Sequence, residues 1–487
     1  MSPEIFETVI GLEVHIQLGT ESKLFCACSA RSFGAAANSN VCPVCTGQPG
    51  ALPALNRRAV QLAIRAALAL DCRVAPRSVF ARKNYFYPDL PKGYQISQFE
   101  HPYGLGGALE IEADGRVKKI NLERIHMEED AGKLMHDIGG EKLDGSLVDL
   151  NRAGVPLIEI VSKPDLGAPA EAYQYLTTLK TVLQYVEVSK CDMEKGEMRC
   201  DANVSLRPKE NHGGRLGVKV EVKNLNSFKA VQSALEYEIE RQAKVLGSGG
   251  RVAQETRLWD ADLRQTRCMR SKEEAHDYRY FPEPDLPPLA ISAKWVEEVR
   301  AELPELPQAR RRRLREEYGL SAYDIGVLTA QRALADYFER GMRSQTPPPS
   351  AKLLSNWITT ELLGRLNAGN LEVAQSPVST ENLAALTALI ENGSISGKMA
   401  KEVFGRMWST GRAAGDIVAE AGLSQVSDDG LLRQWIETAI RENEKAAADV
   451  RGGKTRAVAA IVGAVMRESR GKANPAKVNQ LILEILK

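Results

Sequence analysis

Glu13, His15 and Gln17 occupy alternate positions in the segment from Ile10 to Leu18. Alternate side chains of a β-strand point to the same face, so this spacing predicts a strand with one polar face. The opposite face is predicted to be apolar and buried, and it comprises Leu12, Val14, Ile16 and Leu18. A carboxylate, an imidazole and an amide in one row suit a divalent cation or a phosphate group. A solvated polar face is the alternative, and for a single strand it is the commoner arrangement.

The same alternation recurs in two later segments. The first predicted strand has a core face of Met198, Cys200, Ala202 and Val204 and a polar face of Arg199, Asp201, Asn203 and Ser205. The second has a core face of Val218, Val220 and Val222 and a polar face of Lys219, Glu221 and Lys223. If these strands adjoin the first one in a sheet, their polar side chains converge on one surface.

Three consecutive acids close a hairpin predicted over residues 110–130, which turns at Asp114-Gly115. Carboxylates so close together repel one another, so their spacing is easiest to explain if positive charge lies among them. At this level a bound magnesium ion and structural salt bridging explain the acids equally well. The candidate site residues are Glu13, His15, Glu128, Glu129, Asp130, Asp201, Asn203 and Glu221.

The chain has eight cysteines, and four of them lie within a stretch of twenty residues. They form two close pairs, Cys26-x-Cys28 and Cys42-x-x-Cys45, which supply enough thiolates to close a tetrahedral zinc site. Zinc is favoured over four unrelated thiols or a redox pair. Because protein ligands would fill all four positions, such a zinc would be structural.

Around these residues, apolar spacing predicts helices over 56–70, 170–186 and 227–246. Segment 83–98 contains two prolines and three tyrosines, which favours an aromatic loop, either a ligand wall or a packed surface loop. The proline-rich stretch 278–288 is predicted to close the first domain, and beyond Ser292 the pattern is helical.

Composition excludes several classes of protein. The 487 residues carry a net charge of +1 and contain no long apolar run, and the N-terminus lacks the features of a signal peptide. We therefore expect a cytosolic protein with no membrane partner. The motifs of a phosphate-binding P-loop and of a serine hydrolase are absent from the sequence. The tail from Asp449 to Lys487 is basic, which suits either phosphate binding or simple solvation.

Longer motifs, taken together and in order, resemble the B subunit of the aspartyl/glutamyl-tRNA amidotransferase. They are Gly11-Leu-Glu-Val-His-Ile-Gln-Leu18, the two cysteine pairs, Tyr87-Pro-Asp-Leu-Pro-Lys-Gly-Tyr-Gln-Ile-Ser-Gln98, His126-x-Glu-Glu-Asp-Ala-Gly-Lys133, Asn151-Arg-x-Gly-x-Pro-Leu-Ile-Glu159, Arg199-x-Asp-x-Asn203, Glu221-x-Lys-Asn-Leu-Asn-Ser227, Arg279-Tyr-Phe-Pro-Glu-Pro-Asp-Leu286, Ser396-Gly-Lys-x-Ala-Lys-x-Val-Phe404 and Gly471-Lys-Ala-Asn-Pro475. The resemblance covers almost the whole chain.

The resemblance implies one part of a three-subunit ligase that converts Glu-tRNA(Gln), Asp-tRNA(Asn) or both into the amide forms. The A subunit, an amidase, hydrolyses glutamine, and the small C subunit braces the pair. The B subunit uses ATP and Mg²⁺ to phosphorylate the side-chain carboxylate of the tRNA-bound residue, and ammonia from the A subunit then displaces phosphate. The implied fold is α+β, with a mixed-sheet cradle domain over 1–294, a helical domain over 295–415 and a helical tail domain over 416–487.

The resemblance also distributes roles among the candidates. Magnesium ligation is expected from Glu13, His15, Glu128 and Glu221, and the pocket lining from Glu129, Asp130, Asp201 and Asn203. Substrate or ATP contacts are expected from Tyr87, Lys92, Arg199, Lys223 and Arg279. Contacts with the body of the tRNA are expected from Lys454, Arg456, Arg470, Lys472 and Lys477. The four clustered cysteines match the zinc-bearing version of the family.

Two other functions are compatible with the sequence. One is a non-catalytic tRNA-binding scaffold, in which the acids only support the structure; scattered acids in the fold would favour it. The other is a complete single-chain amidotransferase, which the missing glutaminase nucleophile disfavours.

Overall fold

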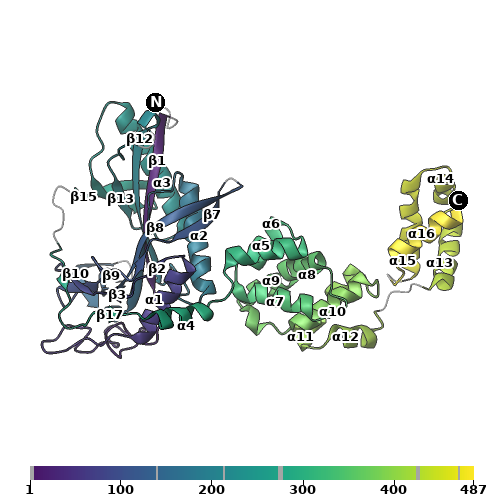
Figure 1. Ribbon diagram of the computed structural model, residues 1–487. Helices are drawn as coiled ribbons and strands as arrows, with labels where there is room; N and C mark the ends of the chain where they lie inside the picture. The colour runs from purple at the N-terminus through teal and green to yellow at the C-terminus, as the bar shows by residue number, and fades with distance from the viewer. Residues whose placement is uncertain are drawn as a thin grey trace. The chain divides into compact units, whose positions relative to one another are not determined.

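The computed structural model describes residues 5–113, 115–138, 141–211, 214–271, 278–423, 428–469 and 472–486. The chain divides into two compact units, Met1–Ala309 and Arg310–Lys487, which are described separately. Figure 1 shows the sheet in the first unit and the helices that make up the second.

The first unit is built on a ten-stranded sheet with the order β15-β14-β13-β12-β1-β11-β8-β6-β2, and β7 pairs with β8. In the described part of the chain, β13 and β14 are the only neighbouring strands of this sheet that run parallel, so the sheet is mixed, as predicted. Its strands are β1 (Phe6–Gln17), β2 (Arg73–Val74), β6 (Gly104–Leu105), β7 (Ala108–Ala113), β8 (Arg116–Glu129), β11 (Pro156–Ser162), β12 (Met198–Pro208), β13 (Val220–Lys223), β14 (Glu255–Asp260) and β15 (Gln265–Ser271).

One face of this sheet forms the core of the unit. Leu12, Val14 and Ile16 are buried as predicted, and they pack with α1 (Arg57–Ala69), α2 (Pro169–Tyr185) and α3 (Phe228–Gly247). The three helices confirm the predicted ranges to within one residue at each end. Asn56 and Ser227 cap α1 and α3 by accepting hydrogen bonds from backbone N–H groups of the first turn. The helices therefore leave the polar face of β1 free to form a site.

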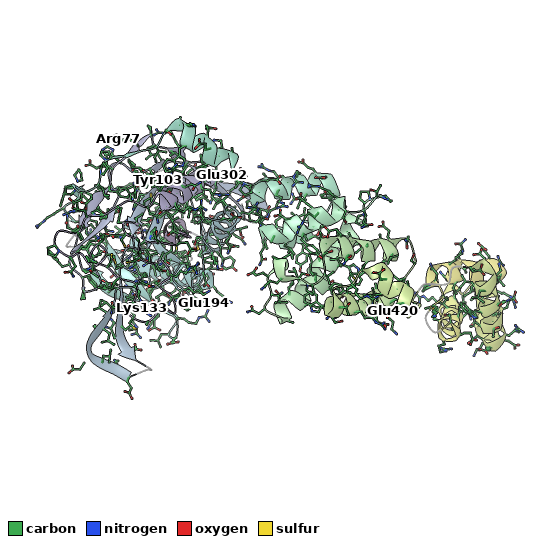
Figure 2. The ribbon with its side chains drawn as sticks, turned by 90° about the horizontal axis from the view of Figure 1, so that it is seen from below. Arg77, Tyr103, Lys133, Glu194, Glu302 and Glu420 are labelled. Carbon is green, nitrogen blue, oxygen red and sulfur yellow. The ribbon has the colours of Figure 1, made fainter. Side chains whose placement is uncertain are left out.

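Shorter strands and one helix complete the first unit. β4 (Ala81–Asn84) lies between β5 (Tyr94–Ser97) and β16 (Phe281–Pro282), so the predicted aromatic loop is irregular only between the two strands at its ends. β3 (Arg77–Ser78) pairs with β17 (Leu289–Ala290), and η2 (Lys209–Asn211) follows β12. Helix α4 (Ala293–Ala301) packs on α1, where Arg57 lies over the Trp295 ring. The hairpin of β9 (Lys133–Ile138) and β10 (Glu141–Asp149) projects from the unit, and Lys133 marks its base in Figure 2.

One predicted strand boundary is wrong. The alternation predicts that Val218 faces the core, but its side chain is 47% exposed because β13 begins only at Val220. Ser205, predicted on the polar face, is buried. The predicted hairpin is formed by β7 and β8; its Asp114 lies outside the described residues.

The second unit is helical, and the described residues after Ala290 contain no strand, as predicted. Its helices form two separate cores, one between Leu314 and Ile417 and one between Leu432 and Leu486. The predicted domain bounds stay predictions. The helices are α5 (Pro307–Tyr318), α6 (Ala322–Leu328), α7 (Arg332–Arg343), α8 (Ala351–Trp357), η3 (Ile358–Leu362), α9 (Leu363–Ala368), η4 (Val373–Gln375), α10 (Thr380–Glu391), α11 (Gly397–Thr410), α12 (Ala414–Ala421), α13 (Asp429–Glu442), α14 (Glu444–Arg451), η5 (Thr455–Ala457), α15 (Val458–Glu468) and α16 (Pro475–Leu486).

Over the described part of the chain, no helix combines the length and the apolar character needed to cross a membrane.

Candidate active site

The polar face of the sheet carries a row of side chains across four adjacent strands. In the register of the sheet, His126 of β8 lies opposite Glu159 of β11, Glu159 opposite His15 of β1, and His15 opposite Arg199 of β12. Two residues further along β1, Glu13 lies opposite Asp201. Because directly opposed side chains are close neighbours, residues far apart in sequence meet on this face.

His15, Glu128 and Glu159 form the tightest cluster in this row. His15 Nε2 lies 3.5 Å from Glu128 Oε1 and 3.3 Å from Glu159 Oε2. One ligand atom from each of the three residues falls within 4.8 Å of the others. Two carboxylates and an imidazole converging on one point match the oxygen and nitrogen ligands that divalent cations take in proteins. These three residues could therefore hold a metal ion.

The surroundings keep both buried carboxylates ionised. Burial by itself raises the pKa of Glu128 and of Glu159, but the neighbouring histidines and Lys83 outweigh it and lower both values. His126 makes the largest opposing contribution in each case, and His15 and Lys83 add to it. Both carboxylates are thus ionised, as cation ligation requires, whereas His15, whose pKa burial lowers but Glu159 and Glu128 raise, would give up its proton when a cation binds.

A second acidic group lies beside this cluster. Burial, and then the nearby Glu159, Glu221 and Asp201, raise the pKa of Glu13. Lys223 pairs with Asp201 and lies 3.2 Å from a carboxylate oxygen of Glu221. A positive group among these acids relieves their mutual repulsion, as the sequence pattern indicated for the site as a whole.

These side chains line a cavity of about 570 Å³, which we call the sheet-face cavity. A volume of this size is within the range of small-molecule sites. Asp130 is held at its wall by Arg199 Nη2, at 2.8 Å, and by Gln17 Nε2, also at 2.8 Å. The lining residues are Glu13, His15, Lys83, Tyr85, Gln95, Gln98, Phe99, Arg124, His126, Glu128, Asp130, Ala131, Glu159, Arg199, Asp201, Glu221, Lys223, Tyr278 and Tyr280.

Most of the acids named from the sequence come together here, but two of the predicted site residues do not line this cavity. Glu129 points to the other side of β8, where its carboxylate pairs with Lys92 and accepts a hydrogen bond from the Ile96 N–H at 2.9 Å. Successive residues of a strand face opposite ways, so Glu128 and Glu129 cannot share a face. Asn203 lines a neighbouring pocket and donates to Glu13 Oε1 at 3.1 Å.

The predicted substrate-binding residues are divided among several places. Arg199 and Lys223 line the sheet-face cavity, whereas Lys92 lines a smaller one beside the cysteine cluster. Arg279 lines an adjoining aromatic cavity, and Tyr87 is exposed. In the tail, Lys454 pairs with Asp449, Lys477 pairs with Asp429, and Arg456 and Lys472 are exposed; Arg470 lies outside the described residues.

Sequence reasoning missed four ionisable residues of the cavity: Lys83, Arg124, His126 and Glu159. Glu159 ends one of the family motifs but was not predicted in the site. The sequence did contain a signal for Glu159: it is the single acid, between Leu-Ile and Ile-Val, of an otherwise apolar segment. An acid in a buried strand is rarely without a charged partner, so this position indicates a site. His126 could have been found by alternation with Glu128.

The four clustered cysteines are free thiols whose sulfur atoms lie within 4.8 Å of one another. The Sγ atoms of Cys42 and Cys45 are 3.9 Å apart, close to the separation of about 3.8 Å that tetrahedral bonds of about 2.3 Å to zinc imply. The Cys45 sulfur accepts from the Cys42 N–H at 3.2 Å and lies 3.5 Å from Lys23 Nζ. A hydrogen bond with Cys26, together with these groups, lowers the pKa of Cys45 to about 4. The cluster therefore fits a metal ion that prefers thiolates.

Comparison with known proteins places the first part of the chain in a family of catalytic domains. A family model described as the GatB/GatE catalytic domain matches residues 8–297, and one described as the GatB domain matches residues 336–486. The chain is 54% identical over 481 residues to the B subunit of the aspartyl/glutamyl-tRNA(Asn/Gln) amidotransferase of Carboxydothermus hydrogenoformans, covering 99% of both chains. It is also 54% identical to proteins of that name from Moorella thermoacetica, covering 99% of this chain and 100% of the relative, and from Geobacter sulfurreducens, covering 99% of each. The chain belongs to this B-subunit family, which confirms the resemblance.

We predict that Cys45→Ser strongly lowers the zinc content of the purified chain, because three thiolates no longer close a tetrahedral site. Metal analysis of the full chain measures this. Cys268→Ser is the matched control, since Cys268 lies outside the cluster and is exposed. Equal zinc content in the wild type and both variants would contradict the prediction.

We predict that Glu159→Gln weakens Mn²⁺ binding by the full chain at least about tenfold, since a neutral amide replaces a charged ligand of nearly the same shape. Electron paramagnetic resonance of free Mn²⁺ measures the affinity. Glu123→Gln, an exposed carboxylate on β8, is the control. If Glu159→Gln and Glu123→Gln had the same affinity for Mn²⁺, the cation site would lie elsewhere.

Proposed function

We propose that this chain is the kinase and transamidase half of a glutamine-dependent amidotransferase. It would act on misacylated Glu-tRNA(Gln), Asp-tRNA(Asn) or both, in the cytoplasm. The observation that carries the proposal is the convergence of His15, Glu128 and Glu159 inside a cavity lined by further acids and by several cations. Such a mixture suits phosphoryl transfer, in which positioning and electrostatic stabilisation supply most of the catalysis.

The reaction needs ATP because a carboxylate is a poor acylating agent. An oxygen of the tRNA-borne side-chain carboxylate attacks the γ-phosphorus of ATP, and ADP leaves. Ammonia then forms the amide bond at the carbonyl carbon, and inorganic phosphate leaves with the carboxyl oxygen. Each step replaces one bond by another and needs no oxidant or reductant.

The chain's own side chains suit these two steps. Magnesium, which neutralises charge on the transferring phosphoryl group, would be held by His15, Glu128 and Glu159, with the predicted ligands Glu13 and Glu221 in the same cavity. Lys83, Arg199 and Lys223 would bind phosphate oxygens, since all three line this cavity. Glu13, whose pKa is raised, could accept a proton from ammonia as it attacks.

An aromatic cavity beside the sheet-face cavity offers a place for the nucleobase of ATP. Phe99 and Tyr280 line both cavities, and their rings stack with centroids 4.2 Å apart and an interplanar angle of 5°. Phe99 is 52% exposed, so an aromatic surface is open to a planar ligand. Arg279 lies in the same cavity and would contact the ribose or base.

The proposed partners follow from the family. Glutaminase chemistry needs a nucleophile that no motif of this chain supplies, so we assign it to the amidase of the complex, the A subunit, and we include a small C subunit that braces the pair. The zinc at Cys26, Cys28, Cys42 and Cys45 would be structural. The tail would contact the body of the tRNA through its phosphates.

The clustering of the acids disfavours the scaffold alternative. A tRNA-binding protein without chemistry has no need for two ionised, buried carboxylates aimed at one point, because burying them costs free energy. Glutaminase activity of the isolated chain would instead favour the single-chain alternative.

The decisive experiment measures ADP and amide formation by the three-subunit enzyme, with Glu-tRNA(Gln), ATP and ammonium chloride in place of glutamine. We expect ADP and Gln-tRNA to form together and both to be lost in Glu128→Ala and Glu13→Ala. Glutaminase activity is the internal control, and it should persist in both variants because it belongs to another chain. Normal amide formation in both variants, or tight tRNA binding by the wild type without ADP, would overturn the proposal.

We predict that a chain ending at Leu423 binds tRNA more weakly but keeps the fold of the first unit. The tail core draws only on residues from Leu432 onward, so its removal takes no side chain from the other two cores. Filter binding over a range of salt concentrations measures the tRNA affinity, and the salt dependence should become shallower as phosphate contacts are lost. An unchanged tRNA affinity would contradict the role of the tail.

A further inference from the structure

Gln98 follows β5 at the wall of the sheet-face cavity and is 2% exposed. The oxygen of its side-chain amide is hydrogen-bonded, but the nitrogen is not. Its carbonyl oxygen, Oε1, accepts hydrogen bonds from the backbone N–H of Met127 at 3.1 Å and of Tyr103 at 3.3 Å. Its Nε2 group is buried and has no hydrogen-bond partner among the described residues.

The two backbone bonds settle which way the amide faces. A backbone N–H can only donate, so the atom that meets two of them must be the oxygen. Rotating the amide by 180° would place an NH₂ group against two donors and lose both bonds. The nitrogen end is therefore fixed, and it carries two hydrogens that no described protein group accepts. A buried donor without an acceptor costs free energy, unless a bound ligand supplies the acceptor.

The neighbours of Gln98 indicate what the ligand is. Met127 lies between His126 and Glu128 on β8, so the N–H that holds Gln98 belongs to the strand that carries two residues of the site. Glu128 has its own donor in Ser97 Oγ, at 3.3 Å. A fixed donor beside a group of cation ligands and cationic side chains is suited to an oxygen of an anion that these charges attract.

We propose that Gln98 Nε2 binds an oxygen of the anionic reactant, either a phosphate oxygen of ATP or an oxygen of the side-chain carboxylate that is phosphorylated. This inference rests on the proposed function and adds a substrate-binding residue to it. The role of the two backbone bonds is to hold the amide ready, so that no reorientation is needed when the reactant enters.

Two substitutions separate the donor from the rest of the side chain. Gln98→Glu keeps an oxygen for the Met127 and Tyr103 N–H groups but, at pH 8, where a carboxyl group is ionised, has no hydrogen to donate. Gln98→Met adds no charge but leaves those N–H groups without their acceptor. The two variants share the loss of the donor, whereas the added charge belongs only to Gln98→Glu and the lost acceptor only to Gln98→Met.

The test uses the three-subunit enzyme at pH 8, with calorimetric unfolding to show that the variants are folded. We expect both variants to lose about tenfold or more in one affinity, as for a hydrogen bond to a charged group. A loss in binding of a non-hydrolysable ATP analogue with Mg²⁺ assigns the donor to phosphate. Unchanged analogue binding with a raised KM for Glu-tRNA(Gln) assigns it to the carboxylate.

The inference and the proposed function fail in different ways. If the wild type forms no ADP with ammonium chloride and Glu-tRNA(Gln), the proposed function fails. If the wild type forms ADP and either folded variant retains both affinities, Gln98 is not a substrate-binding residue and the proposed function stands.

Discussion

The antiparallel register of β8, β11, β1 and β12 is the constraint on which the candidate site depends. It sets His126, Glu159, His15 and Arg199 opposite one another, although they come from four separate stretches of the chain. A shift of one residue in any of these pairings would turn that strand's site residues toward the core. The apolar faces of the same strands, buried against α1, α2 and α3, oppose such a shift because it would expose them. The core therefore maintains the geometry of the site.

The site also sets positive and negative side chains close together. Two buried carboxylates remain ionised because two histidines and Lys83 lie close by, and Asp130 is held by Arg199 and Gln17. In a cavity that excludes part of the solvent, fixed charges act over short distances with little screening. The same groups that stabilise the cavity would then orient a phosphate and a carboxylate, both of which carry negative charge.

The end of β8 connects this cavity to a second one. Glu128 faces the sheet-face cavity, whereas the next residue, Glu129, pairs with Lys92 in the cavity that Cys26 and Cys45 also line. Lys23 is fully buried there and spans from the Cys45 sulfur to the backbone oxygen of Asn40. A zinc ion bound by the cysteines would thus stabilise the loop that forms one wall of this second cavity. Rigid support of this kind is what a positioned active site requires.

The sequence by itself determined most of the elements of the first unit and indicated two places where a metal ion could bind. Alternation identified the polar and buried faces of β1 and most of β12, helical spacing located α1, α2 and α3, and the spacing of four cysteines indicated a thiolate site. These are local properties, since a strand or a helix shows its periodicity within one segment. The motifs, read in order, identified the family. Only the tertiary structure decided which side chains meet. It brought Glu159 into the site and left Gln98 with an unused donor, because these outcomes depend on the pairing of strands distant in sequence. The sequence of one segment does not show which residues of another strand it will pair with.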